Sequence, residues 1–542
     1  MPTYQLASTD GRGYLVPLTQ GPVTIGRNKD NVLCIADESA SRYHCVIEPD
    51  GAGGFRVRDL GSRNGTKINA NRLVNAASEV VPGDTIKVGG HSFTIEAEMS
   101  IGEVRHEVRS RTIDVDKAWL EELKGMLEAL PPKGEGDEQI VMVDGSGQAT
   151  PALSGTADGP RAVRLLLLLA AKSRATDIHV EPKQHRYNVR IRVDGQMVQV
   201  AELPEKVGEL CLGLVRTACL MRPEARDAVQ DGHFSVKFRS RRVDYRVSLT
   251  PSMHGQKLVV RVLDAANAPR SLIELGLPPY MADRVKRACQ KEQGFILVCG
   301  PTGSGKTTTL YNALREIDRD TTNVVTIEDP VEYQLEGVTQ IPADDAKGNS
   351  FGNLLRSVLR QDPDVILVGE IRDEETARTA MQAAMTGHLV FSTVHSKDSI
   401  SAVFRLLDLK VEPFLVASSL ELVLAQRLVR SLCDNCKRPV RITPGQATRM
   451  GKFLEGKNDV YIPVGCTACL KTGYRGRRAI FELLDFSDEL RDVVLKDPTI
   501  ASIKNAVGRG MFTTLLQAGW QLAARGSTSL DEVERVVGGG VA

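Results

Sequence analysis

Several features that mark other classes of protein are absent from this sequence. The longest strongly apolar run, residues 163–171, contains Arg164 and is far shorter than the roughly 20 residues that a membrane-spanning helix needs. The N-terminus lacks a charged start and a continuous apolar stretch, so no secretory signal is predicted. Lys and Arg number 69 against 68 Asp and Glu, so no global basic field exists to gather nucleic acid. These absences predict a cytoplasmic protein without a nucleic-acid partner and with only peripheral contact to a membrane.

Cysteine is also scarce, with ten in 542 residues, which is too few for a disulfide scaffold. Four of the ten form two C-x-x-C pairs, Cys433 with Cys436 and Cys466 with Cys469. In a reducing compartment this pattern indicates a metal, because four thiolates can hold a tetrahedral Zn²⁺. A site made only of cysteine leaves no coordination position open for catalysis, so we predict a structural zinc. Unliganded or redox-active thiols are the alternative.

The length predicts several domains joined by linkers. Residues 1–98 alternate between short apolar strands and turn signals, as in an all-β sandwich. Residues 99–160 contain one possible helix, 116–130, followed by a stretch typical of a flexible linker. Strand and helix patterns then alternate to about residue 428, as in α/β units, and the tail from residue 485 is mostly helical. The strands expected in the first region are 15–18, 23–25, 45–48, 55–59, 86–88 and 93–95.

A phosphate-binding motif lies near the centre of the chain. The segment GPTGSGKT, residues 300–307, fits GxxxxGK[S/T] and lies between an apolar strand run, 295–299, and an amphipathic helix. Its glycines let backbone N–H groups wrap a triphosphate, Lys306 offers a charge to the β- and γ-phosphates, and the Thr307 hydroxyl can bind Mg²⁺. The strand-turn-helix context disfavours a glycine-rich turn without a ligand. The predicted ATP-binding residues are Gly300, Pro301, Thr302, Gly303, Ser304, Gly305, Lys306, Thr307 and Thr308.

Three other apolar runs end in polar residues. One run precedes Glu328 and Asp329, the next precedes Glu370, and the third leads to His395. In a parallel sheet these ends lie on the edge that carries the phosphate loop, so the side chains should converge on the γ-phosphate. Each acidic residue alone could be a solvated strand end or a helix cap. Their coincidence favours a catalytic site in which Glu370 holds Mg²⁺ or orients water, with Glu328 and Asp329 assisting.

These segments resemble the motifs of the type II secretion and type IV pilus-assembly ATPases. The resemblance covers residue 161 to the C-terminus and implies Lys306, Thr307 and Glu370 as nucleotide, metal and catalytic residues. It also implies His388 and His395 as members of a histidine box. The matching segments are GPTGSGKTTTLY (300–311), TIEDPVE (326–332), VGEIRD (368–373) and TGHLVFSTVH (386–395).

The region before the phosphate loop is similar to the second N-terminal, PAS-like domain of that family, through ATDIHVEP (175–182) and VRIRVDG (189–195). Alternation along its strands exposes arginines on one face, which in most proteins is only a solvated face. The resemblance implies instead that Arg246 and Arg261 reach the γ-phosphate from outside the core. His233 and Gln256 depart from the family pattern and leave details of interdomain coupling open.

Residues 26–27, 41–44, 59–66 and 82–86 form an ordered set of short motifs that resembles forkhead-associated (FHA) domains, a second resemblance that covers the first 98 residues. It implies that Arg27, Ser41 and Arg42 contact the phosphate of a phosphothreonine and that Asn64 holds the peptide backbone. Two guanidinium groups and a hydroxyl suit a dianion with several acceptor oxygens. The alternative is a sandwich that serves only for docking. The matching segments are GR (26–27), SRYH (41–44), DLGSRNGT (59–66) and PGDTI (82–86), in which Gly26, His44 and Gly65 shape the loops.

The predicted architecture is therefore multidomain. An FHA sandwich (1–98) and a linker (99–160) precede an α/β second N-terminal domain (161–270) and a RecA-like P-loop ATPase core (271–430). A tetracysteine zinc module (431–475) and a helical C-terminal domain (476–542) complete the chain.

The predicted function is a hexameric ATPase motor that uses ATP, Mg²⁺ and Zn²⁺. Its expected partners are an inner-membrane platform protein and a cytoplasmic adaptor of a secretion or pilus system, together with a phosphothreonine-containing protein. A retraction or conjugative-transfer ATPase is an alternative, disfavoured by the cysteine pairs and by AQRLVR (425–430). A regulatory scaffold with an idle ATPase is disfavoured by the intact Lys306, Thr307 and Glu370.

Overall fold

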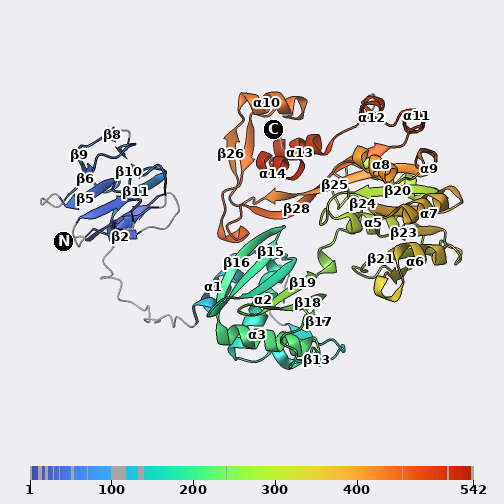
Figure 1. The fold of residues 1–542 in the computed structure, drawn as a ribbon, viewed down its shortest axis with the longest axis horizontal. Helices are drawn as coiled ribbons and strands as arrows, with labels where there is room; N and C mark the ends of the chain where they lie inside the picture. The colour runs from blue at the N-terminus through green and yellow to red at the C-terminus, as the bar shows by residue number, and fades with distance from the viewer. Residues whose placement is uncertain are drawn as a thin grey trace. The chain divides into compact units, whose positions relative to one another are not determined.

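The computed structural model describes residues 3–9, 15–18, 22–28, 30–35, 37–49, 54–69, 71–98, 117–131, 140–239, 241–454, 456–508 and 512–538. The chain divides into two compact units, Met1–Thr112 and Ile113–Ala542 (Figure 1). Within the described ranges, no helix combines the length and the apolar character needed to span a bilayer.

The first unit consists of two β-sheets that share one apolar core. Side chains alternate along its strands, as in β6 (Phe55–Asp59), where residues 55, 57 and 59 are buried and the two arginines between them are exposed. The predicted β-rich domain is confirmed, and each of the six expected strands is present. One sheet has the order β2 (Leu15–Pro17), β1 (Thr3–Ser8), β11 (His91–Glu98), β10 (Thr85–Val88), β7 (Thr66–Ile68) and β8 (Asn71–Leu73); the other has β4 (Leu33–Cys34), β3 (Val23–Gly26), β5 (Cys45–Pro49), β6 and β9 (Ala77–Val80).

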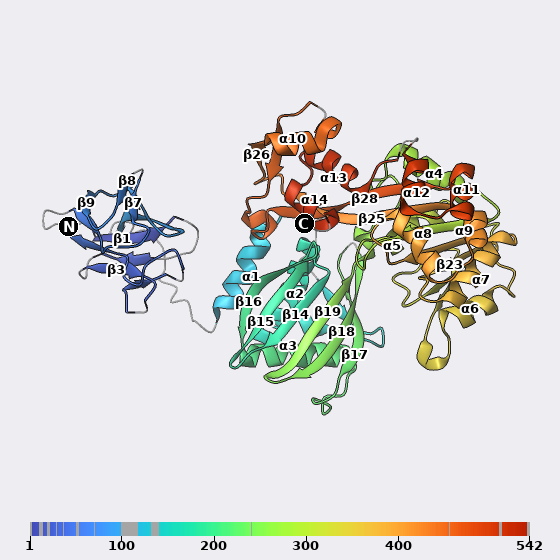
Figure 2. The same cartoon turned by 45° about the horizontal axis from the view of Figure 1, so that its top comes forward.

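The second unit begins with an eight-stranded sheet that is antiparallel throughout. Figure 2 shows its strands from β16 (Gln196–Pro204) to β17 (Gln230–Lys237) side by side. Helices α1 (Ala118–Ala129), α2 (Asp158–Ser173) and α3 (Glu205–Ala218) share one core with it. Strands and helices therefore both occur from residue 161 onward, as predicted, but parallel strands occur only in the later part of the range 161–428. The strand order is β13 (Ala149–Thr150), β12 (Val141–Val143), β17 (Gln230–Lys237), β18 (Arg242–Ser252), β19 (Gly255–Leu263), β14 (Asp177–Pro182), β15 (Arg186–Val193) and β16 (Gln196–Pro204).

The second half of the predicted linker is structured instead. Strand β12 pairs with β17 at the edge of the eight-stranded sheet, and β13 pairs with β12. The Asp144 carboxylate accepts hydrogen bonds from the backbone N–H groups of Ser146 and Gln148. These bonds stabilise the turn between β12 and β13. These strands have only three and two residues, too few for alternation to distinguish them from a loop. Residues 132–139 of the predicted linker lie outside the described residues.

A seven-stranded sheet forms the centre of the second unit. Neighbouring strands from β22 to β25 are parallel, and β28 is added antiparallel to β25. The apolar runs predicted at 295–299, 324–327, 365–368 and 389–391 are all strands of this sheet. The order is β22 (Thr339–Pro342), β21 (Val324–Glu328), β23 (Val365–Val368), β24 (Leu389–Val394), β20 (Gly294–Cys299), β25 (Leu420–Leu432) and β28 (Tyr474–Asp485).

Helices cover both faces of this sheet, as the alternation in β20 shows. Phe295 and Leu297 belong to one apolar cluster, while Ile296 and Val298 belong to another. The second cluster includes α4 (Pro279–Cys289) and α5 (Lys306–Leu314). The first includes residues of α6 (Phe351–Val358), α7 (Glu374–Met385), α8 (Ser399–Asp408) and α9 (Pro413–Ser419). A sheet buried on both faces explains why these strands are continuous apolar runs.

The predicted helical C-terminal domain begins with a strand instead, since residues 476–485 form most of β28. The helices expected after residue 485 are present. They are α11 (Asp488–Lys496), α12 (Ile500–Val507), α13 (Leu515–Ala524) and α14 (Leu530–Val537). The cysteine module contains α10 (Pro444–Met450), the 3₁₀ turns η5 (Gly451–Leu454) and η6 (Thr467–Cys469), and a two-stranded sheet of β26 (Arg438–Arg441) and β27 (Asp459–Ile462).

A buried carboxylate joins β28 to two helix N-termini. Glu482 is 4% exposed, and its Oε1 accepts bonds from the backbone N–H (2.9 Å) and hydroxyl (2.5 Å) of Ser399 at the start of α8. Its Oε2 accepts the backbone N–H of Leu515, the first residue of α13, at 3.1 Å. A negative charge at a helix N-terminus is favourable, because the first N–H groups have no partner within the helix.

Replacement of Glu482 by alanine should therefore leave two buried N–H groups without an acceptor. We expect Glu482→Ala to lower the free energy of unfolding by roughly 2–6 kcal/mol, since each of the two unsatisfied groups costs about 1–3 kcal/mol. Thermal or denaturant unfolding of the full chain measures the effect. The control is Glu534→Ala, which breaks an exposed pair with Arg449 and should change stability by less than about 1 kcal/mol. Equal effects of both variants would contradict the assigned role.

Candidate functional site

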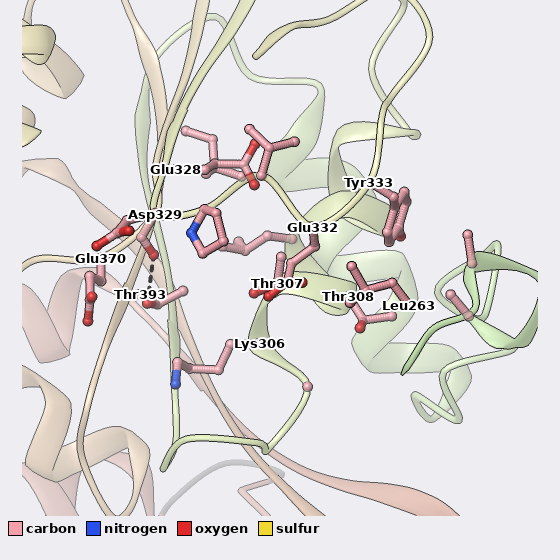
Figure 3. A pocket seen from close by; sticks show the side chains of 18 of the residues that line it. Leu263, Lys306, Thr307, Thr308, Glu328, Asp329, Glu332, Tyr333, Glu370 and Thr393 are labelled. Atoms are coloured by element: carbon pink, nitrogen blue, oxygen red, sulfur yellow. Dashed lines mark hydrogen bonds between the residues drawn. The ribbon is translucent and has the colours of Figure 1, made fainter. Parts of the chain in front are cut away.

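A cavity of about 1070 Å³ lies where the phosphate loop, the strand ends of the seven-stranded sheet and the eight-stranded sheet meet (Figure 3). Six of the predicted site residues line it: Lys306, Thr307, Glu328, Asp329, Glu370 and His395. The predicted ATP-binding residues Thr302, Gly303, Gly305 and Thr308 also line it. The convergence expected of parallel strand ends is therefore present in the folded chain.

The phosphate loop has the backbone geometry that its glycines predict. Gly300, Gly303 and Gly305 have φ angles of +157°, +76° and +88°, which disfavour other residues. A Cβ on Gly300 would lie 2.5 Å from Ser304 Oγ, whereas one on Gly303 would meet nothing within 4 Å. Gly303 thus faces open space, where a phosphate can approach the backbone.

Two side chains of the loop suit a phosphate ligand. Lys306 Nζ donates to the carbonyl oxygens of Gly300 (3.0 Å) and Pro301 (3.2 Å). Burial lowers the pKa of Lys306, and the nearby Glu370 charge opposes that shift. In the part of the chain that the structure describes, the buried Ser304 Oγ has no hydrogen-bond partner. A triphosphate would supply acceptors to both groups, so the residues fit the predicted nucleotide.

A glutamine that the sequence analysis did not single out fastens the loop to the sheet. The buried Gln426, in β25, donates from Nε2 to Ser304 O at 2.8 Å and accepts at Oε1 from the Thr309 hydroxyl at 2.5 Å. It belongs to the segment AQRLVR (425–430), whose sequence alone indicates only a resemblance to one branch of the family. Its separation from the loop by more than a hundred residues left no local signal.

Glu370 belongs to a charged cluster at the end of β23. Its Oε1 accepts bonds from the Nε (2.6 Å) and Nη2 of Arg372, and its Oε2 lies 3.3 Å from His395 Nε2. Arg372 Nη2 also lies 3.4 Å from Asp329 Oδ2, so one guanidinium links the two carboxylates. The sequence analysis did not assign Arg372 a role, because nothing in a motif shows which way its side chain points.

Glu328 is more enclosed than the other carboxylates, at 3% exposure. Its Oε1 accepts bonds from Thr326 Oγ1 (2.6 Å) and Gln340 Nε2 (3.1 Å), and its Oε2 accepts the Tyr311 hydroxyl. Both oxygens therefore already have protein partners. The arrangement suits a carboxylate that holds the cavity wall in shape.

The two arginines predicted to reach the phosphate lie side by side but differ in their contacts. Arg246 and Arg261 are cross-strand partners in β18 and β19. Arg246 Nη2 donates to the carbonyl oxygen of Val331, which lines the cavity (2.9 Å). Arg261 does not line it; its side chain is 65% exposed and pairs with Asp177 at 3.3 Å. From the same sheet, Arg242 lines the cavity instead, which sequence reasoning missed.

The two histidines of the predicted histidine box lie at opposite ends of β24. His395 follows the strand and lines the cavity. His388 precedes the strand, and its Nδ1 lies 3.0 Å from Ala383 O, at the edge of the sheet away from the phosphate loop. The structure therefore brings only His395 to the site.

The first unit has a separate cavity of about 680 Å³, lined by all four predicted phosphopeptide residues. Ser41 is fixed in place, because its Oγ accepts the backbone N–H of Arg63 (3.0 Å) and its own N–H donates to His44 Nδ1 (3.0 Å). The Asn64 side chain donates to Ser39 O at 2.8 Å. The guanidinium groups of Arg27, Arg42 and Arg63 are exposed around it, so a third arginine adds to the two predicted.

A buried aspartate holds the loop that carries Arg63 and Asn64. Asp59 is 2% exposed and accepts the hydroxyls of Ser62 (2.6 Å) and Thr66 (2.7 Å) together with backbone N–H groups that include that of Asn75. Burial would raise the pKa of Asp59, but these hydrogen bonds outweigh it and hold the pKa below its usual value. The loop that carries Arg42 packs closely against Gly26. A Cβ at this position would lie 2.4 Å from Arg42 O, so a larger residue would not fit.

The four predicted metal ligands form one cluster, with all their sulfur atoms within 4.8 Å of one another. Cys433 Sγ lies 3.9 Å from Cys466 Sγ, and Cys466 Sγ lies 3.7 Å from Cys469 Sγ. Thiolates about 2.3 Å from a tetrahedral Zn²⁺ lie about 3.8 Å apart, so the residues fit the ion. Backbone N–H groups of Gly465 and Gly473 point at the sulfurs of Cys436 and Cys469, at 3.3 Å each.

Comparison with known proteins identifies the family. Residues 156–535 match the family described as type II/IV secretion system protein, and residues 23–89 match the FHA domain. The first match spans well over half of the chain. The chain belongs to the type II/IV secretion system protein family. Its prediction as a P-loop ATPase with an N-terminal FHA domain is confirmed.

Relatives of this secretion-family ATPase cover the same region. The type II secretion system protein E of Aeromonas hydrophila is 40% identical over 391 residues, which are 72% of this chain and 78% of the relative. The type IV pilus assembly ATPase PilB of Myxococcus xanthus is 41% identical over 380 residues, 68% of this chain and 66% of the relative. The solved structure of the Legionella pneumophila ATPase DotB has a TM-score of 0.53 at 21% identity, covers 70% of this chain and 96% of its own, and so shares the fold.

The contact between Arg372 and Glu370 can be tested by substitution in this family member. Arg372→Ala should leave Glu370 without its guanidinium partner while removing no residue that lines the cavity. Loss of hydrogen bonds to a charged group is expected to lower ATP turnover roughly ten- to hundredfold, with a smaller change in KM. Steady-state phosphate release measures both. Arg378→Ala, which breaks pairs on α7 with Glu374 and Glu412, is the matched control; a parental rate in Arg372→Ala would refute the role.

Proposed function

We propose that this chain is an ATP-hydrolysing motor that powers type II secretion or type IV pilus assembly at the inner membrane, recruited or regulated through phosphothreonine recognition. One observation carries the catalytic part: Lys306, Thr307, Glu370 and His395 line a single cavity although they follow three different strands, β20, β23 and β24. The relatives named for type II secretion and type IV pilus assembly support the physiological part.

The residues divide the chemistry among them. Backbone N–H groups of the phosphate loop and Lys306 bind the β- and γ-phosphates, and the Thr307 hydroxyl is placed to hold Mg²⁺, which would neutralise phosphate charge when bound. Glu370 orients the attacking water, with Arg372 and His395 setting the direction of its carboxylate. Asp329 is held nearby through Arg372 and assists.

Arginines of the eight-stranded sheet supply further positive charge. Arg246 already contacts the cavity wall, and the exposed Arg261 beside it would reach the nucleotide after a shift of that sheet. Both would offset charge that develops on the transferred phosphoryl group. We propose that such shifts occur between subunits of a six-membered ring and that their rigid-body motion acts on an inner-membrane platform protein, with a cytoplasmic adaptor attaching the ring.

An idle ATPase that serves only as a scaffold is the second candidate. The described residues do not favour this candidate, since Lys306, Thr307 and Glu370 are all present and line the cavity. A retraction or conjugative-transfer motor would use the same catalytic residues. The four-cysteine cluster of this chain argues against that candidate.

The catalytic assignment predicts that Lys306→Ala and Glu370→Gln each lower phosphate release at least about a hundredfold, because each removes a group that stabilises transition-state charge or positions water. Lys496→Ala, an exposed lysine paired with Asp492, is the control and should keep the parental rate. Turnover near the parental rate in either site variant would sink the assignment.

The metal assignment predicts about one zinc per chain, held by the four cysteines. Cys433→Ser or Cys466→Ser should release the ion, seen by elemental analysis, and should raise protease sensitivity within residues 431–475, since binding energy in structural sites is folding energy. Cys34→Ser, which lies outside the cluster, should retain the zinc. A parent protein without zinc would end the idea.

The FHA assignment predicts binding of phosphothreonine peptides by the full chain. A phosphothreonine carries about −1.5 to −2 charges at pH 7, whereas threonine offers a single hydroxyl. Arg27→Ala should weaken binding roughly ten- to hundredfold, the value of one charge-assisted bond, and leave ATP turnover unchanged. Arg56→Ala, on β6 beside Glu79, is the control for charge. A peptide library that shows no preference for the phosphorylated form would reduce the domain to a docking module.

A further inference from the structure

A second cavity, of about 520 Å³, adjoins the nucleotide cavity and shares Tyr333, Gln334, Ala265 and Ala268 with it. It lies beyond the C-terminal end of α5, the helix that begins at Lys306. The nine residues of α5 span about 13 Å at 1.5 Å per residue. Figure 3 shows Tyr333 on the side of the nucleotide cavity away from Glu370. Phosphates held at Lys306 are therefore too far away to occupy this second cavity.

Three arginines gather around this second cavity. Arg315 caps α5, Arg319 lies in the following loop, and Arg270 comes from the segment between η3 (Ala265–Asn267) and α4. Arg319 Nη1 donates to the carbonyl oxygen of Glu336 at 2.7 Å. Among the described residues, no side chain forms a hydrogen bond or ion pair with the guanidinium group of Arg315 or Arg270. Glu336 is the one carboxylate among the lining residues.

Tyr333 adds a further unused donor. Its hydroxyl is buried and has no hydrogen-bond partner among the described residues. Burial raises the pKa of Tyr333, and the charge of Arg315, which lines the same cavity, opposes the shift. The Tyr333 ring packs edge-on against Tyr311 at 4.7 Å between centroids, and the Tyr311 hydroxyl donates to Glu328. The wall of the second cavity is thus continuous with the catalytic one.

This set of groups consists almost entirely of donors. Guanidinium groups that line one cavity repel one another, and a buried hydroxyl without a partner costs free energy. A ligand with several negatively charged acceptor oxygens would satisfy all of them, and the fork of Arg matches phosphate oxygens in pairs. We propose that this second cavity is a binding site for a small phosphate-bearing anion, separate from the nucleotide site.

The test uses the full chain carrying Lys306→Ala and Arg42→Ala, which disable the other two proposed phosphate sites. Pyrophosphate is the probe, and calorimetric titration should find about one bound per chain. Adding Arg315→Gln and Arg319→Gln should weaken that binding at least about tenfold. Arg287→Gln, an exposed arginine on α4 outside the cavity, is the matched control and should not change it. Arg315→Lys, which keeps the charge, should retain most of the binding.

Three results would overturn the proposal. The first is a background variant that binds no pyrophosphate, and the second is binding that survives Arg315→Gln with Arg319→Gln. The third is competition by adenosine, which would assign the cavity to the base of ATP. None of these results depends on ATP turnover. If the proposed anion site fails the test, the proposed motor function still stands or falls with the turnover of the Lys306→Ala and Glu370→Gln variants.

Discussion

The parallel pairing of β21, β23, β24 and β20 is the constraint on which the rest of the structure depends. It carries the ends of all four strands to one edge of the sheet, so that Glu328, Glu370, His395 and the phosphate loop meet there. Apolar helices on both faces hold those ends rigid. Catalysis by positioned charges needs that rigidity, since the groups must not reorganise during the reaction.

Polar bonds between distant segments extend this rigidity to the neighbouring parts of the second unit. In the turn between β15 and β16, Asp194 Oδ2 accepts the backbone N–H of Gly476 (2.7 Å), and Gln196 accepts a bond from Arg430 (2.5 Å). Arg430 also pairs at 2.7 Å with the buried Glu532 of α14. The eight-stranded sheet, the central sheet and the C-terminal helices are therefore linked through few, specific contacts. These contacts would oppose the shift of the eight-stranded sheet that we propose brings Arg261 to the nucleotide.

The sequence predicted those parts of the fold and site that local patterns encode. Contiguous motifs such as residues 300–307 and apolar runs ending in acids sufficed for the cavity, because strand direction alone places them together. Contacts between distant segments left no such pattern, as with Gln426 beneath the phosphate loop and Arg63 beside Ser41. Short edge strands such as β12 were missed because three residues are too few to show alternation. The antiparallel β28 was missed because its largely apolar run at 479–484 does not by itself distinguish a strand from a helix.

The central claim is that this cavity is a catalytic ATP site that arginines complete when chains associate. The most direct measurement is phosphate release per chain over a wide range of protein concentration, with the oligomeric state followed by light scattering in the same samples. Turnover per chain should rise with concentration as chains assemble and then level off once the ring is complete. Monomers that keep full turnover on dilution would contradict the account.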